Sequence, residues 1–265
     1  MKNVVLSNED FQDFPIGEFP YDKDHTAMGE YQYVVENGYH GNWVDMVCNY
    51  TYNGTGPTWL ITERDGRHFM ESMRIEKNRP HRMFPTLETG KHQWKDYEVS
   101  VSVRRLSQKG MAGLVFSMNH SIDTLVFYLD GKDKAAVAYR HKEEVQVLKE
   151  VSFPHGCDQE YCLKVDCDGR IAKVYVDDQE LFRVEDDLVA RGGKVGITAD
   201  CPSRFADFKV CVSEKTKQEI DVAERAVKET ETEEMKKHPK MKLWKKIDLK
   251  NFGTSRQIRF GHLTG

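Results

Sequence analysis

The sequence lacks three features that would each assign the chain to a class of protein. No segment approaches the ~20 apolar residues that cross a bilayer, and the N-terminus has no apolar run followed by small residues. The charges are scattered and sum to only -4, so they form no basic patch of the kind that binds nucleic acid. We therefore expect no nucleic-acid and no membrane partner. The chain as written is expected to be cytoplasmic, or extracellular if an upstream segment is removed.

The 6 cysteines also lack the spacing of a metal site, because no C-x-x-C pair or His partner accompanies them. Cys162 and Cys167 lie on one expected strand at positions of opposite parity. Alternation points them to opposite faces, so they cannot share a ligand. We interpret the cysteines as buried free thiols.

What the sequence does have is period-two alternation, which runs from Tyr97 to about Val212 and is typical of antiparallel strands. The segment "YEVSVSVRRL" alternates valines with polar residues. Asp130-Gly131 and Asp168-Gly169 are strong hairpin turns, because both residue types tolerate positive φ. These signals predict an all-β domain, with a tight hairpin in "YCLKVDCDGRIAKVYVDD".

The regions on either side of this segment differ from it. The first ninety-odd residues have Gly- and Asn-rich loops around short strands, and long loops on a β scaffold usually carry function. From Ser213 the sequence predicts an exposed charged helix that begins with a serine cap and ends at Pro239. Ile220, Ala223 and Val227 form a narrow apolar stripe on this helix.

The segment from Tyr161 to Val212 resembles the C-terminal half of concanavalin-like jelly rolls, a group that includes laminin-G-like domains and sugar-hydrolase-like sandwiches. The resemblance rests on G-x-V-G-I at Gly193–Ile197 and F-x-D-F-x-V at Phe205–Val210, while "EDFQDFPIGEFP" is similar to the first strand, which pairs near the last. It implies an all-β fold, a concanavalin-like jelly-roll β-sandwich of two antiparallel sheets over residues 1–212. A helical linker over 213–238 follows.

The tail "WKKIDLKNFGTSRQIRFGHLTG" is similar to the start of the propeller in bacterial proteins related to rhamnogalacturonan lyases. There, R-x-I-R-F-G-D-L-x-G-D-G opens an FG-GAP-like blade, whereas this chain has His262 in place of the first aspartate of that pattern. One partial blade cannot fold alone. We therefore expect residues 239–265 to begin a truncated propeller-like domain, which the sandwich would contact in a longer protein.

A sugar-binding groove needs flat aromatic rings beside charged or amide groups. These groups come from aromatic residues in the loops, from a basic segment, and from two strand residues that we expect with Tyr128 on the concave sheet. The candidate carbohydrate-binding residues are Tyr39, Trp43, Arg74, His81, Arg82, Tyr139 and Arg140. Arginine pairs a uronate carboxylate in two places, so an acidic, pectin-type polysaccharide or oligosaccharide fits. The alternative for Tyr39 and Trp43 is a place in the core, and for the basic segment a solvated loop.

Catalytic residues are harder to find in the sequence. Related glycosidases carry their acids as E-x-D-x-x-E on one strand, and no such run is present. We therefore predict a carbohydrate-binding module attached to a catalytic domain outside this chain. Two alternatives stay open: a polysaccharide lyase or glycoside hydrolase that acts in the groove through His81 or Glu76, and a sandwich that only packs against its neighbour.

The resemblance also implies a structural Ca²⁺ where the first and last strands meet, because hard oxygen ligands suit that ion. Asp207 occupies the matching position of the closing strand, and Glu9, Asp10 or Asp13 would be the early partner, with Asp10 as our choice. The alternative is that Asp207 only bonds the backbone.

Overall fold

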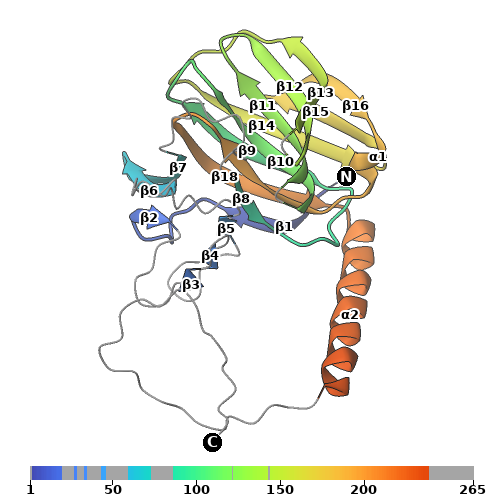
Figure 1. Ribbon diagram of the computed structural model, residues 1–265. Helices are drawn as coiled ribbons and strands as arrows, with labels where there is room; N and C mark the ends of the chain where they lie inside the picture. Colours follow the sequence, from blue (N-terminus) through green and yellow to red (C-terminus); the bar gives the residue numbers. More distant parts are fainter. Residues whose placement is uncertain are drawn as a thin grey trace, which may run out of the picture. The chain divides into compact units, whose positions relative to one another are not determined.

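The alternating segments form two antiparallel sheets that face each other across an apolar core (Figure 1). The computed structural model describes residues 2–19, 27–28, 33–34, 43–45, 59–72, 86–120, 122–142 and 144–238. The chain divides into two units, residues 1–224 and 225–265, and the sandwich belongs to the first. The tail expected to begin a propeller lies outside the described residues.

The described strands are shared equally between the two sheets. Sheet A contains, in spatial order, β16 (Gln179–Glu185), β15 (Ile171–Val176), β14 (Glu160–Asp168), β9 (Glu98–Arg105), β18 (Ser203–Val212), β7 (Arg67–Ser72), β6 (Trp59–Arg64) and β2 (Gly17–Phe19), and β1 (Val4–Glu9) also pairs with β18. Sheet B contains β13 (Glu144–Ser152), β12 (Lys134–His141), β11 (Asp123–Asp130), β10 (Met111–His120), β17 (Lys194–Ala199), β8 (Thr86–Thr89), β5 (Val44–Asp45), β4 (Tyr33–Val34) and β3 (Ala27–Met28). This arrangement confirms the all-β sandwich of two antiparallel sheets.

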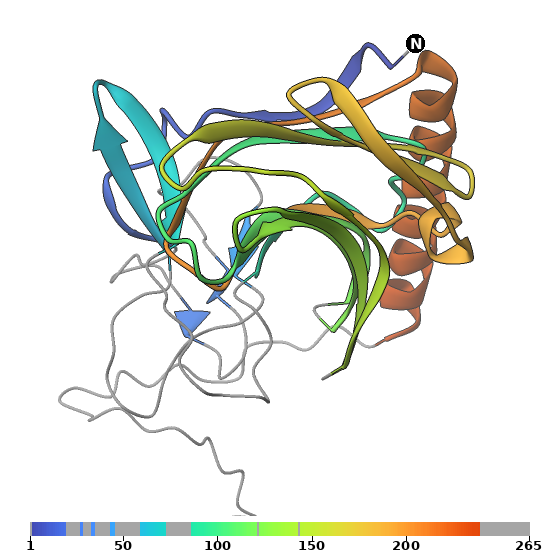
Figure 2. The same ribbon diagram turned by 90° about the horizontal axis from the view of Figure 1, so that it is seen from above.

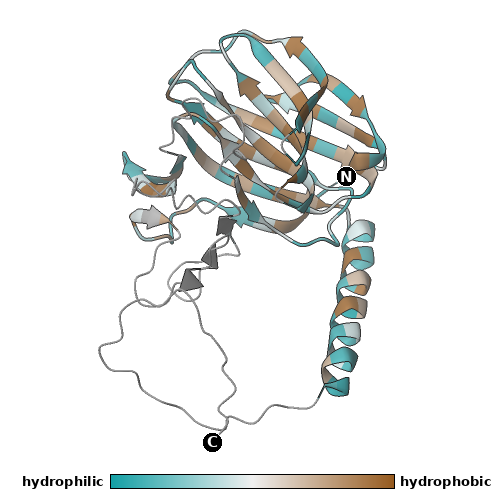
Figure 3. Ribbon diagram, viewed as in Figure 1, coloured by the Kyte–Doolittle hydropathy of each residue, from teal (hydrophilic) through white to brown (hydrophobic). Residues whose placement is uncertain are grey.

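Local sequence explains the best-defined hairpin, β14 and β15. Its turn contains Gly169 at φ 54°, and the strand leading into it alternates between half-buried and buried side chains. Cys162 is half-buried and Cys167 is buried, which confirms that they lie on opposite faces. Figure 3 shows the same alternation of apolar and polar residues along the strands of both sheets.

The N-terminus pairs as expected but from a different segment. The expected first strand was "EDFQDFPIGEFP", whereas β1 ends at Glu9 and pairs with β18. The chain then turns at Phe11, which has φ 62°, and both Phe11 and Phe14 pack into the core. Gly17–Phe19 of the expected segment forms β2, which pairs with β6 and not with the last strand.

Helix α1 (Asp187–Ala190) is a single turn, and α2 (Glu214–Lys237) is the expected charged helix. The Ser213 hydroxyl accepts a hydrogen bond from the Thr216 N–H at 3.1 Å and so caps α2. Ile220 is 1% exposed, but Ala223 and Val227 are exposed, so the buried stripe is narrower than expected. Within the described residues, no helix is both long and apolar enough to cross a membrane.

Sheet B has a second apolar cluster, on the face that points away from the inter-sheet core. Side chains on this outer face would be solvent-exposed in a flat, uncovered sheet. Several are instead almost completely buried, namely Met111, Val115, Met118, Val126, Tyr128, Ala136 and Ala138. Figure 2 shows the green strands of sheet B as a strongly curved layer.

One hydrogen-bond set shows how far this curvature goes. Arg140 on β12 donates to the hydroxyls of Thr86 on β8, at 3.2 Å, and of Thr198 on β17, at 3.5 Å. Three strands lie between β12 and β8 in the sheet. At about 4.8 Å per strand, a flat sheet would place them roughly 19 Å apart, beyond the reach of a side chain. Sheet B is therefore rolled, and Arg140 ties its two sides together across the outer face.

Glycine permits the close strand spacing inside this roll. A Cβ at Gly113 would lie 2.0 Å from the Phe127 carbonyl oxygen, and one at Gly196 would lie 2.0 Å from the Leu87 carbonyl oxygen. Both contacts involve the backbone of a neighbouring strand, which cannot move aside without opening the sheet. A side chain at either position would therefore oppose the curvature.

Candidate functional site

The outer face of sheet B carries two carboxylates on either side of one methionine. Met111 at the start of β10 lies opposite Asp130 at the end of β11. On its other side, the Met111 N–H donates to Asp200 Oδ1 at 2.5 Å, and the Asp200 N–H donates to the Met111 carbonyl at 3.0 Å. The order of strands thus places Asp200, Met111 and Asp130 in one row at the end of the sheet.

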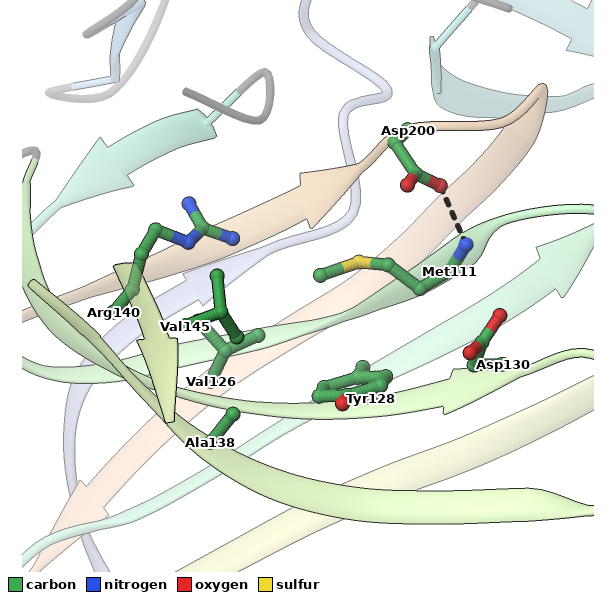
Figure 4. A pocket seen from close by; sticks show the side chains of 8 residues that line it. All are labelled: Met111, Val126, Tyr128, Asp130, Ala138, Arg140, Val145 and Asp200. Atoms are coloured by element: carbon green, nitrogen blue, oxygen red, sulfur yellow. Dashed lines mark hydrogen bonds between the residues drawn. The ribbon is translucent and has the colours of Figure 1, made fainter. Parts of the chain in front are cut away.

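This row borders a pocket of about 150 Å³ inside the roll. Its lining consists of Met111, Val126, Tyr128, Asp130, Ala138, Arg140, Val145 and Asp200. Figure 4 shows Arg140 on one side of the pocket and Asp200 and Asp130 on the other, with the side chains of Val126, Ala138 and Tyr128 between them. The pocket is therefore apolar in the middle, cationic on one side and anionic on the other.

Burial shapes the charges in this pocket. It lowers the pKa of Arg140 to about 10, against the opposing effect of the Asp200 charge, so the guanidinium is still protonated at neutral pH. Burial raises the pKa of Asp200, while the hydrogen bond from the Met111 N–H lowers it and the Asp130 charge raises it further. Burial also raises the pKa of Tyr128, so its hydroxyl is protonated and able to donate at neutral pH.

Of the seven residues proposed from the sequence, the structure describes Trp43, Tyr139 and Arg140, and among these three Arg140 lines the pocket. Tyr39, Arg74, His81 and Arg82 lie outside the described residues. Tyr139 precedes Arg140 on β12 and points to the opposite face, because consecutive strand residues alternate. The expectation that both face the concave sheet is therefore wrong.

Tyr139 instead joins a polar cluster at the end of the inner face. Its hydroxyl lies 2.9 Å from Asp123 Oδ1 and 3.0 Å from His141 Nδ1. Arg191 donates to the same Asp123 oxygen at 2.7 Å and to the Ser117 carbonyl at 2.8 Å. Burial raises the pKa of Asp123, but the hydrogen bonds from Arg191, Asn119 and Tyr139 outweigh it and the net shift is downward. We interpret this cluster as a structural one, because it connects sheet B to the segment after α1.

Trp43 is a core residue, so the expectation of an exposed stacking ring is wrong. It is 4% exposed, and its ring centroid lies 4.8 Å from that of Phe208 and 5.6 Å from that of Phe11. Its side chain also hydrogen-bonds Glu9, whose pKa is raised by burial and lowered in part by this bond. The ring therefore has no face left for a sugar.

The proposed calcium ligands have protein partners. Asp207 lies in a bulge of β18 at φ 50°, and its carboxylate pairs with Arg67 and accepts from Ser102 at 3.3 Å. Asp10 is exposed and accepts from the Gln12 N–H at 3.0 Å. No group of three or more metal-ligating side chains occurs in the described part of the chain. The calcium site stays a prediction.

Sequence reasoning missed Met111, Asp130, Val145 and Asp200 as pocket residues. Parity offered a partial signal, since Asp130 has the parity of Tyr128 along β11. Asp130 was interpreted only as a turn residue, and Asp200 follows a strand without any motif. What brings them together is the pairing of β11 and β17 on either side of β10.

No family model and no curated protein matches the sequence. Among solved structures, a Bacillus subtilis protein of unknown function with a galectin-like fold is 10% identical, with a TM-score of 0.50, over 81% of this chain and 99% of that one. The carbohydrate-binding module CBM66 from Bacillus subtilis is 16% identical, with a TM-score of 0.49, over 64% of this chain and 96% of that one. The GH43 protein BlXynB from Bacillus licheniformis is 14% identical, with a TM-score of 0.47, over 73% of this chain and 40% of that one. At such identities the likeness concerns the fold, a galectin-like β-sandwich.

Proposed function

We propose that this sandwich is a carbohydrate-binding module and that the pocket of sheet B holds one ring of an acidic polysaccharide or oligosaccharide. The observation that carries the proposal is the arrangement of the pocket, in which apolar side chains separate the Arg140 guanidinium from the Asp130 and Asp200 carboxylates. A uronic acid is complementary to this arrangement, because it has a carboxylate at one end, an apolar ring face, and hydroxyl groups that can donate hydrogen bonds elsewhere.

Each part of such a ring has a partner of suitable chemistry. Its C–H face would lie on Val126, Tyr128 and Ala138, its hydroxyls would donate to the two aspartates, and its carboxylate would accept from Arg140. The volume of about 150 Å³ is below the ~300–1,000 Å³ of sites for drug-sized ligands. The pocket therefore suits a single sugar ring rather than a longer oligosaccharide.

The resemblance of the tail supports the finer proposal that the module serves an enzyme acting on plant-type polysaccharide such as rhamnogalacturonan. The galectin-like fold does not assign a ligand, because one fold hosts many functions. The proposed ligand therefore depends on the pocket itself and is tested there.

Two exposed valines on β13 offer a matched test. Val145 lines the pocket next to Arg140 and is 47% exposed, whereas Val147 is 44% exposed on the same face but does not line it. Val145→Asp places a negative charge beside the position proposed for the uronate carboxylate. A like charge there should cost on the order of 1 kcal/mol, about a fivefold loss of affinity.

The measurement is calorimetric titration of each variant with galacturonate oligomers and with neutral galactose oligomers. Val145→Asp should weaken the acidic ligand about fivefold more than the neutral one, and Val147→Asp should leave both close to wild type. Equal weakening of both ligands by Val145→Asp would reject the acidic assignment. The absence of binding to either ligand in the wild type would reject the proposed function.

A hydrolase is the second candidate, because two carboxylates border one pocket. Asp130 ends β11 and Asp200 directly follows β17, with β10 between these two strands, so their Cα atoms are separated by roughly 10 Å. Glycosidase carboxylates are about 5–9.5 Å apart, and one of them has a raised pKa, as Asp200 has. Release of reducing ends by the purified protein, lost in Asp200→Asn, would establish this activity.

A further inference from the structure

Arg105, at the end of β9, is a buried cation that lies beside the pocket but does not line it. It is 2% exposed, and its side-chain partners among the described residues include no carboxylate. Its guanidinium donates instead to the carbonyls of Gly110, at 2.7 Å, and of Gly131, and it lies 3.0 Å from His155 Nδ1. Burial of a charge without a carboxylate partner costs several kcal/mol unless hydrogen bonds offset it. Such a group calls for an explanation beyond packing.

The two carbonyls explain where this cation acts. Gly110 precedes Met111, and Gly131 follows Asp130, so Arg105 holds the backbone beside two of the three members of the row. The third member of the row packs against the same turn, because a Cβ at Gly110 would lie 2.4 Å from Asp200 Oδ1. The position of both pocket carboxylates thus depends on turns that Arg105 fixes.

His155 completes the arrangement only when its imidazole is neutral. Arginine can only donate, so Nδ1 must accept, and the proton then sits on Nε2, which donates to the Lys134 carbonyl at 3.2 Å. The Tyr161 ring packs edge-on against the imidazole, with 6.3 Å between the ring centroids. The negative charge of Asp130, on β11, favours the protonated imidazole. Burial lowers the pKa of His155, and the Arg105 charge lowers it further. A proton on Nδ1 would face the arginine N–H groups and break this contact.

We propose that Arg105 and neutral His155 are positioning residues for the sugar pocket, and that protonation of His155 loosens the turns at Gly110 and Gly131 and weakens sugar binding in acid. This inference rests on the proposed function for its ligand. The geometry of Arg105 and His155 is a property of the free protein and does not depend on the proposed function.

The test compares His155→Gln with the wild type between pH 7.5 and 4.5. Glutamine can accept from Arg105 through its amide oxygen and donate to the Lys134 carbonyl through its nitrogen, but it does not titrate. Galacturonate affinity and hydrogen exchange of the Met111 amide, which bonds Asp200, are measured at each pH. Because both proteins carry the same pocket carboxylates and differ only at residue 155, the difference between the two profiles isolates His155.

We expect the wild type to lose about tenfold more affinity and more Met111 protection than His155→Gln on acidification, which corresponds to ~1.4 kcal/mol. Arg105→Lys should weaken binding about tenfold at every pH, because lysine cannot reach all three acceptors from one planar group. The control is Arg104→Lys, because Arg104 is a neighbour on β9 that points to the other face and forms ion pairs of 3.7 Å with Asp158 and 3.8 Å with Glu160.

Identical pH profiles for wild type and His155→Gln would overturn the proposal, and so would wild-type exchange at Met111 in Arg105→Lys. If the wild type binds no sugar at any pH, the proposed function fails while Met111 exchange still decides the positioning role. The failure of one claim is thereby separated from the failure of the other.

Discussion

Replacing Trp43 by alanine should greatly lower the free energy of unfolding of the protein and should not remove a sugar contact. The indole is 96% buried between Phe11 and Phe208, so its removal leaves a cavity that the two sheets cannot collapse to fill. Such large-to-small changes cost about 3–5 kcal/mol, against a total stability of roughly 5–15 kcal/mol for a domain. The change also removes a hydrogen-bond donor from the half-buried Glu9 carboxyl.

Urea unfolding followed by circular dichroism measures this loss. With a slope of about 2–3 kcal/mol per molar, the midpoint should fall by roughly 1–2.5 M. Trp43→Phe keeps a ring in the core and loses the indole N–H, so it should fall by less. Below its transition, Trp43→Ala should still bind galacturonate with wild-type affinity. A wild-type midpoint together with lost sugar binding would show that Trp43 is a ligand residue and that its core placement is wrong.

Three further predictions follow from burial and close packing. Gly196→Ala should lower the free energy of unfolding by about 1–3 kcal/mol, because its Cβ would meet the Leu87 carbonyl oxygen, and a wild-type urea midpoint would contradict the tight roll of sheet B. The pKa of His155 is lowered in the folded protein, so the unfolded chain binds more protons at this residue. The contribution of His155 to stability is therefore complete above pH ~6.5 and is lost as the pH falls toward the pKa of the folded state. Melting temperatures measured against pH should show this loss in the wild type and not in His155→Gln. Burial raises the pKa of Cys201 to about 11, so a thiol reagent at pH 8 should modify half-buried Cys157 before it, and mass spectrometry showing the reverse order would refute this.

Much of the architecture could be predicted from local sequence. Alternation in "YEVSVSVRRL" sets the two faces of β9, and Asp168-Gly169 sets the turn between β14 and β15, because strand faces and hairpin turns depend on neighbouring residues. The start of α2 was likewise set by Ser213, whose hydroxyl caps the helix.

The pocket could not be predicted in the same way. Trp43 lies among glycines, yet its burial depends on Phe11 and Phe208, which are remote in sequence. The roll of sheet B depends on the strand order that lets Arg140 reach Thr86, and no local pattern encodes that distance. Parity, in contrast, was available from the sequence and would have separated Tyr139 from Arg140.

The most direct test of the sugar-binding claim is a map of backbone amide chemical shifts on titration of labelled protein with galacturonate oligomers. The account predicts that the shifts concentrate on the outer face of sheet B, at Met111, Tyr128, Arg140 and Val145. Shifts confined to the outer face of sheet A, around Ser102 and Asp207, or no shifts at saturating ligand, would contradict it.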